Sequence, residues 1–186
     1  MKGRSFVLAA LLFVSGSALA REISGVDVPE TLTADGKPLK LNGAGMRKKF
    51  IIKVYVGSLY LQTPASTLAA ITSSDQPWVI HMHFVRSVDK EKIISTMREG
   101  FEKNNPKDKA AWMNGQLDKV VSAFADMKEG HTLVVTYLPG KGTTVGVKGG
   151  AAQAIEGKEF GDRILQNWIG KEPADESLKE ALLGGK

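Results

Sequence analysis

The 186-residue sequence contains no cysteine and only three histidines. The lack of cysteine excludes disulfide bonds, thiol catalysis and zinc–thiolate sites. His81 and His83 lie two residues apart on one predicted strand face, but His131 begins another strand and no carboxylate pattern joins them, so we expect no metal site. The sequence also lacks a phosphate-binding loop, a dinucleotide-binding glycine fingerprint and a G-x-S-x-G motif. We therefore expect no cofactor.

A long apolar run is also missing, since a transmembrane helix needs about 20 predominantly apolar residues. The apolar segment at residues 6–14 is shorter than this, follows two basic residues and precedes a small-residue cleavage pattern at residues 18–20. This arrangement is typical of a secretory signal peptide. We expect residues 1–20 to be removed and residues 21–186 to form one domain without a transmembrane segment. An exported protein without disulfides fits the bacterial periplasm.

The sequence has no large excess of charge of one sign. It contains 25 Lys and Arg against 20 Asp and Glu, and removing Lys2 and Arg4 with the signal peptide leaves a net charge of +3. Such a small net charge does not favour nucleic acid or anionic lipid as a partner. We expect no nucleic-acid partner, and the sequence does not predict an oligomeric state.

Apolar periodicity predicts a chain in which strands and helices are mixed. Helical spacing predicts helices over residues 64–70, 87–104, 109–127, 159–170 and 175–183. Alternating or β-branched runs predict strands over residues 26–33, 39–42, 50–61, 78–85, 131–138, 143–148 and 153–155. This order is typical of an α+β domain with a mostly antiparallel sheet and helices packed on one face.

Residues 41–62 contain the longest predicted strand and a single Arg47 at its entrance. Gly43 and Gly45 predict a turn before Arg47, and Gly57 predicts a bulge or a close backbone approach within the strand. An Arg at this position either lies at the solvent rim, beside Lys48 and Lys49, or points into a pocket, and periodicity alone favours the rim. In a pocket, its guanidinium binds a carboxylate or an oxyanion through two hydrogen bonds.

Four segments together resemble the chalcone isomerase-like family: LNGAGMRKKF, KVYVGSLYL, FGDRILQNWIG and DESLKEALLG. The resemblance covers residues 26–184. It implies an open-faced β-sandwich, in which helices cover one face of a large antiparallel sheet. This implied fold agrees with the order of elements predicted from periodicity.

The resemblance implies two activities for Arg47. Plant enzymes of the family close a chalcone to a flavanone, and their catalytic Arg and helical Lys correspond to Arg47 and Lys92. Their other active-site positions match poorly: a strand Thr falls near Tyr55, a helical Asn near Thr96 and a late-helix Thr at Asn167. A chalcone isomerase-type intramolecular lyase is therefore the alternative hypothesis.

The resemblance favours a binding protein, because other members of the broader family hold a fatty-acid carboxylate with an Arg and a Tyr. We expect a small amphipathic ligand, a carboxylate lipid or a phenolic, in an apolar cleft anchored by Arg47. Tyr55 and Tyr60 are both candidates for the partner Tyr, although five residues place them on opposite faces of a regular strand. A structural or interaction protein without a ligand is the third hypothesis. The expected ligand-binding residues are Arg47, Tyr55, Tyr60, Thr96 and Asn167.

Overall fold

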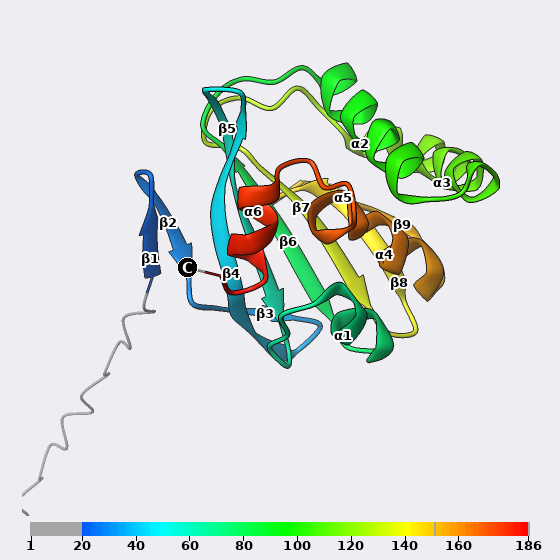
Figure 1. The fold of residues 1–186 in the computed structure, drawn as a ribbon, viewed down its shortest axis with the longest axis horizontal. Helices are drawn as coiled ribbons and strands as arrows, with labels where there is room; N and C mark the ends of the chain where they lie inside the picture. Colours follow the sequence, from blue (N-terminus) through cyan, green and yellow to red (C-terminus); the bar gives the residue numbers. More distant parts are fainter. Residues whose placement is uncertain (1–19, 151, 186) are drawn as a thin grey trace, which may run out of the picture.

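A computed structural model of the protein describes residues 20–150 and 152–185. Nearly all of the predicted signal peptide, residues 1–19, lies outside the described residues. Seven antiparallel strands form one large sheet, and their order across the sheet follows their order in the chain (Figure 1). They are β3 (Thr31–Ala34), β4 (Lys37–Lys49), β5 (Ile52–Leu61), β6 (Trp78–Phe84), β7 (Thr132–Leu138), β8 (Gly142–Val147) and β9 (Ala152–Ile155). A separate hairpin contains β1 (Ala20–Ile23) and β2 (Val26–Pro29).

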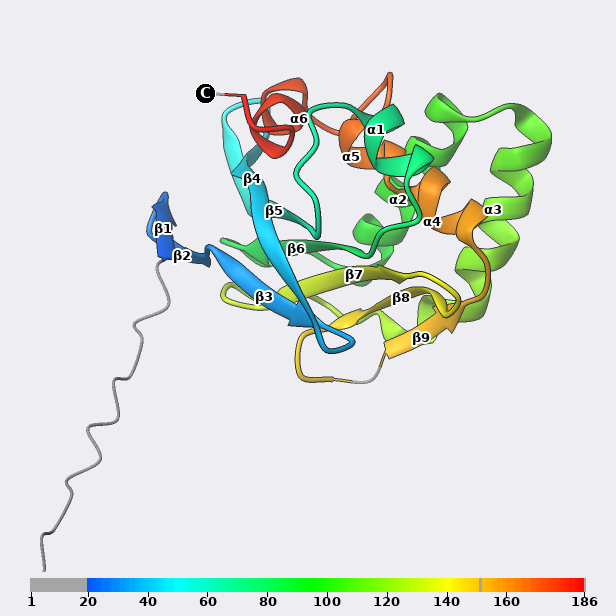
Figure 2. The same ribbon diagram turned by 90° about the horizontal axis from the view of Figure 1, so that it is seen from below.

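The helices lie on one side of the curled sheet, which confirms the predicted α+β architecture (Figure 2). Among the described residues, no helix is long and apolar enough to cross a membrane. The helices are α1 (Leu68–Ser73), α2 (Lys90–Asn104), α3 (Lys107–Val120), the 3₁₀ turn η1 (Val121–Ala123), α4 (Lys158–Ile164), α5 (Gln166–Ile169) and α6 (Glu176–Leu182).

The two faces of the sheet carry different side chains, because successive residues of a strand point to opposite sides. On β6, Met82 and Phe84 belong to the buried core between sheet and helices, together with Trp78 and Ile80. Val79 faces the other side, where it packs with Val28, Leu39, Val56 and Tyr60 in a second, smaller cluster. The alternation predicted for this strand is therefore confirmed.

The glycines before Arg47 do not form the predicted turn but lie inside the long strand β4. Helix α6 packs directly on them: a Cβ on Gly43 would overlap the backbone oxygen of Ala181, and one on Gly45 would lie 2.7 Å from the Ala181 Cβ. The Asn42 amide also donates a hydrogen bond of 2.7 Å to the Leu182 backbone oxygen. Because glycine has no side chain, Gly43 and Gly45 allow α6 to approach β4 closely.

The predicted strand over residues 50–61 is also shorter than expected, because Phe50 and Ile51 form the turn between β4 and β5. Gly57 pairs with Gly45 in an unbroken part of the ladder, so the predicted bulge at Gly57 is absent. The register shifts lie instead between Leu41 and Gly43 and between Arg47 and Lys48. The strand β5 is regular from Tyr55 to Tyr60, because its own irregularity falls at Val54, so these two tyrosines face opposite sides of the sheet.

The first helix begins later than predicted, at Leu68, and its N-cap is Thr67. The Thr67 hydroxyl accepts a hydrogen bond of 3.1 Å from the Ala70 backbone N–H, which is the usual cap geometry. The Thr63 N–H instead donates to the Gln76 side chain at 2.8 Å, so this residue belongs to a fixed loop.

Three longer predicted elements are each divided in two. Residues 109–127 contain most of α3 followed by η1, and residues 159–170 contain most of α4 followed by α5. Residues 26–33 contain β2 and β3. Pro29, which has no backbone N–H, ends β2 at this division.

Candidate functional site

A cleft of about 610 Å³ opens between the β4–β5 hairpin, β6, α2 and α5. Helix α2 contributes to it because Ile93 and Met97, four residues apart, lie on the helix face that packs toward the sheet. The sheet contributes Val54 and Phe84 from neighbouring strands. The buried apolar residues of the lining are Val54, Tyr55, Met82, Phe84, Ile93, Met97 and Trp168. Its volume is that of an ordinary small-molecule site.

Arg47 lines this cleft from the end of β4, where it pairs with Tyr55 on β5. Its guanidinium carbon lies 5.6 Å from the centre of the Tyr55 ring, which is within cation–π range. Its Nε is buried and has no hydrogen-bond partner among the described residues. A buried donor without a partner is unfavourable, so Arg47 offers an unmet hydrogen-bond donor and a positive charge inside the cleft.

Tyr55 presents a fixed phenol beside this cation. Its buried hydroxyl oxygen accepts a hydrogen bond of 3.0 Å from the Trp168 Nε1. Burial raises the pKa of Tyr55, and the positive charge of Arg47 opposes this only in part. The phenol therefore stays protonated at neutral pH and keeps an O–H that can donate to a bound oxygen.

The remaining predicted residues of the cleft come from α2 and α5. Lys92 lines its rim, and its half-exposed ammonium lies 3.9 Å from the Glu99 carboxylate. The Thr96 hydroxyl donates a hydrogen bond of 2.8 Å to the Lys92 backbone oxygen. Asn167 is buried: its Nδ2 donates to the Met97 backbone oxygen at 3.1 Å, and its Oδ1 has no partner among the described residues.

The structure thus brings five predicted residues to one cleft and excludes the sixth. Tyr60 lies on the opposite face of the sheet, where its hydroxyl donates a hydrogen bond of 3.0 Å to the Pro29 backbone oxygen. Tyr60 therefore does not share a ligand site with Arg47, and the expectation that it does is corrected. The five residues lining the cleft are Arg47, Tyr55, Lys92, Thr96 and Asn167.

The sequence did not reveal the cations around the cleft or the role of Trp168. Lys48, Lys49 and Arg86 line its opening together with Lys103. These side chains come from two strand ends and a helix, so only the fold brings them together. Trp168 has the spacing of an ordinary core residue, and its hydrogen bond to Tyr55 spans 113 residues of sequence.

His81 and His83 lie on β6, on the face of the sheet opposite the cleft. His81 packs against the Tyr60 ring at 5.4 Å between ring centres, and the His83 Nδ1 lies 3.1 Å from the Thr132 hydroxyl. Burial lowers the pKa of His81 to about 4 and also lowers the pKa of His83, so both are neutral at physiological pH. No group of three or more metal-binding side chains occurs within the described ranges.

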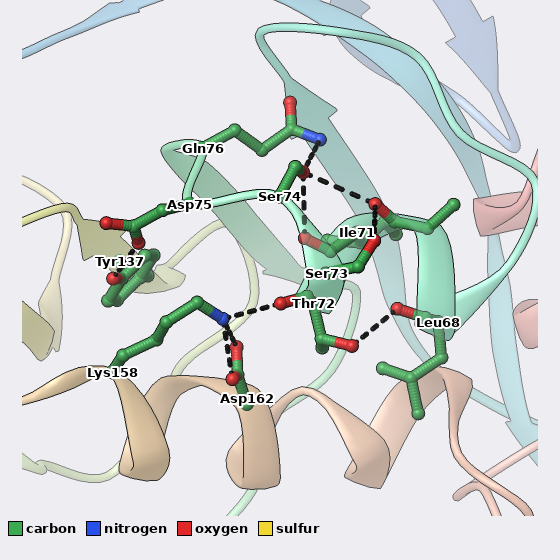
Figure 3. Close-up of polar contacts among 11 residues, drawn as sticks. Leu68, Ile71, Thr72, Ser73, Ser74, Asp75, Gln76, Tyr137, Lys158 and Asp162 are labelled. Carbon is green, nitrogen blue, oxygen red and sulfur yellow. Dashed lines mark hydrogen bonds and ion pairs between the residues drawn. The ribbon is translucent and has the colours of Figure 1, made fainter.

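A second polar cluster joins α1, β7 and α4 (Figure 3). The Tyr137 hydroxyl donates a hydrogen bond of 2.5 Å to Asp75, and the Lys158 ammonium contacts both Asp162 oxygens at 2.5 and 2.6 Å. The same ammonium donates to the Thr72 backbone oxygen at 2.7 Å. Since these groups satisfy one another, the cluster holds the end of α1 against α4 rather than offering a binding site.

A family model of chalcone isomerase-like proteins matches residues 20–184. The chain belongs to the chalcone isomerase-like family. A solved structure of a fatty-acid binding protein from Arabidopsis thaliana has a similar fold, with a TM-score of 0.61 at 16% sequence identity. The similarity covers 90% of this chain and 96% of the plant chain. A comparison with curated protein sequences finds no match.

Proposed function

We propose that this chalcone isomerase-like protein binds a small amphipathic anion, such as a fatty acid, in the cleft beside Arg47. The observation that carries the proposal is the buried, unpartnered Nε of Arg47 at the polar end of an apolar cleft. A ligand carboxylate would accept from this donor and neutralise the cation, while its chain would cover the apolar lining.

The geometry supports a head-group site made of Arg47 and Tyr55. Both side chains offer donors at adjacent, paired positions of β4 and β5. A carboxylate accepts hydrogen bonds and donates none, so two donors and no competing carboxylate partner suit it. Arg47 has no salt-bridge partner among the described residues.

The chain of the ligand would lie between the sheet and α2, against Val54, Phe84 and Met97. Each methylene removed from water contributes about 0.8 kcal/mol, so several buried methylenes supply affinity while the head group supplies orientation. The name of the similar plant structure, a fatty-acid binding protein, supports a lipid ligand for this fold. We further propose that the protein is exported, because residues 1–20 have the pattern of a signal peptide.

The alternative of a chalcone isomerase-type lyase has one supporting observation, which is that Lys92 and Arg47 line the same cleft. Three features favour binding over catalysis. The Thr96 hydroxyl is already bonded within its own helix, the Asn167 amide nitrogen bonds to Met97, and the Tyr55 oxygen accepts from Trp168. These groups are therefore less free to order a reacting ketone and its water.

Native mass spectrometry of the protein purified gently from its own cells tests the proposal. We expect a bound mass that corresponds to a carboxylate lipid or a phenolic and that disappears after delipidation. The delipidated protein should then take up a long-chain fatty acid from solution. Failure to take up any fatty acid, together with turnover of a chalcone, would replace the binding proposal with the isomerase. Failure in both assays would leave a structural protein.

A further inference from the structure

The turn between β4 and β5 carries an unusual set of exposed residues. Residues 48–53, here called the hairpin tip, read Lys-Lys-Phe-Ile-Ile-Lys. Phe50 and Ile51 are 89% and 93% exposed, and Ile52 is 46% exposed. These three are the exposed large hydrophobic residues of the described chain. The tip is the turn at the upper end of β5 in Figure 1, and Lys48, Lys49, Phe50 and Ile52 line the cleft.

The backbone of the hairpin tip is itself unfavourable for the residue it carries. Phe50 has a φ of 57°, in the left-handed region where glycine and asparagine are preferred. A glycine would relieve this strain, and a polar residue would avoid exposing an aromatic ring. Because Phe50 packs on no core of its own chain, folding alone does not explain its presence.

Positive charges surround these apolar side chains. Lys48, Lys49, Lys53 and Arg86 are all exposed, and none of them forms a salt bridge among the described residues. The nearby Asp175 is occupied, since it accepts from the Lys48 backbone N–H and caps α6. The charged residues lining the cleft are six cations (Arg47, Lys48, Lys49, Arg86, Lys92, Lys103) and three carboxylates (Asp89, Glu99, Glu172).

We propose that the hairpin tip docks this protein on an anionic lipid bilayer. Phe50 and Ile51 would insert at the level of the head groups, and the flanking lysines would contact lipid phosphates with their stems along the apolar region. Because Phe50 and Ile52 also line the cleft, a docked tip would place the cleft opening at the membrane surface. This inference rests on the proposed function: from such a position, an amphipathic anion would pass between bilayer and cleft without crossing water.

The dimensions and charge of the tip favour a bilayer over a protein partner. A stable protein interface buries about 800 Å² on each side, far more than three side chains at a convex turn provide. A second copy of the chain meeting through the same tip would bring Lys48, Lys49 and Lys53 against the same residues of the other copy. A bilayer accepts apolar side chains singly and supplies the opposite charge.

The test uses sedimentation with lipid vesicles and a tip variant that leaves the cleft lining unchanged. Neither Ile51 nor Lys53 lines the cleft, so Ile51→Ser combined with Lys53→Gln alters only the docking surface. The matched control combines Lys37→Gln with Lys40→Gln, two exposed lysines at the opposite end of β4.

We expect the wild-type protein to bind vesicles made of equal parts phosphatidylcholine and phosphatidylglycerol, and to bind phosphatidylcholine alone more weakly. Added salt should weaken binding to the mixed vesicles. Losing Lys53 should reduce the partition coefficient about fivefold, and losing Ile51 about tenfold, so the double variant should bind about fiftyfold more weakly if the effects add. The control should lose less than the fivefold expected for one tip lysine.

A second measurement separates this proposal from the proposed function. The tip variant should take up fatty acid from solution like the wild type but acquire it more slowly from mixed vesicles, whereas Arg47→Met should still bind vesicles. Equal vesicle binding by the tip variant and wild type would overturn the docking proposal, even if uptake from solution succeeds. A wild-type dimer that the tip variant converts to a monomer would overturn it too, and would assign the tip to self-association.

Discussion

Replacing Arg47 with methionine separates the head-group interaction from the apolar part of the site. Methionine keeps much of the apolar stem and removes the guanidinium, so the cleft lining changes little. Truncating one partner of a hydrogen-bonded charge pair in a binding site costs about 2 to 5 kcal/mol. We therefore expect the Kd for a long-chain fatty acid to rise at least about thirtyfold.

The folded protein should tolerate this substitution. It removes the cation–π contact with Tyr55, which contributes about 0.5 to 1 kcal/mol. It also removes the buried, unpartnered Nε, whose unmet hydrogen bond is unfavourable by about 1 to 3 kcal/mol. Because the unfavourable effect that is removed is at least as large as the favourable one, the free energy of unfolding should stay unchanged or rise by up to about 2.5 kcal/mol.

The assay is calorimetric titration of delipidated protein with a fatty acid and with the alcohol of the same chain length. Arg47→Met should weaken binding of the acid but not of the alcohol, because only the acid carries the group that Arg47 binds. Lys53→Gln, which removes an exposed cation outside the cleft, serves as the control and should leave both affinities unchanged. Equal losses for acid and alcohol, or a large loss of stability with unchanged binding, would refute the head-group role of Arg47.

Four further perturbations have outcomes with a definite sign. Gly43→Ala should lower the free energy of unfolding in urea by about 3 kcal/mol, because its Cβ would overlap α6. Gly115→Ala, at an open helix position, should raise it by about 1 kcal/mol. Burial lowers the pKa of His81 from 6.5 to about 4, so folding favours its neutral form. Stability should therefore fall by at most about 3 kcal/mol as pH drops through that range, and His81→Gln should flatten the slope. Burial raises the pKa of all three tyrosines, so stability should also fall as pH rises above about 10, with phenolate absorbance appearing as the protein unfolds.

Local patterns were sufficient for most of the fold. The alternation of Trp78 to Val85 predicted both faces of β6, because a strand facing two different clusters shows its orientation in every second residue. The spacing of Ile93, Met97 and Phe101 likewise predicted α2 and its buried face. Such patterns lie within a few residues of one another and need no knowledge of distant contacts.

Where a distant segment decided the structure, sequence patterns were misleading. Gly43 and Gly45 have the composition of a turn, yet their role is to accommodate α6, which begins more than 130 residues later in the chain. The two segments that carried the family resemblance most specifically, around Gly43 and around Leu182, are the ones that pack on each other here. The joint occurrence of these two segments was therefore more informative than the composition of either segment alone.

The candidate site was predicted through resemblance rather than periodicity. Matching motifs indicated Arg47, Tyr55 and Asn167, and the structure places all three around one cleft. Periodicity alone favoured a rim position for Arg47 beside the lysines that follow, whereas its Nε is buried in the structure. The same five-residue spacing that separates Tyr55 from Tyr60 was enough to exclude Tyr60 once β5 proved regular between these two residues.

The net charge of +3 does not describe the charge near the cleft, and a binding partner responds to nearby charge rather than to the charge of the whole chain. At physiological ionic strength the field of an exposed charge is screened over about 8 Å, a distance shorter than the domain. Lys48, Lys49 and Arg86 line the cleft and Lys53 belongs to the hairpin tip beside it, all without salt-bridge partners among the described residues, whereas most carboxylates lie elsewhere. One cluster of cations therefore suits both an anionic head group inside the cleft and an anionic surface outside it, which is why the two proposals require separate variants.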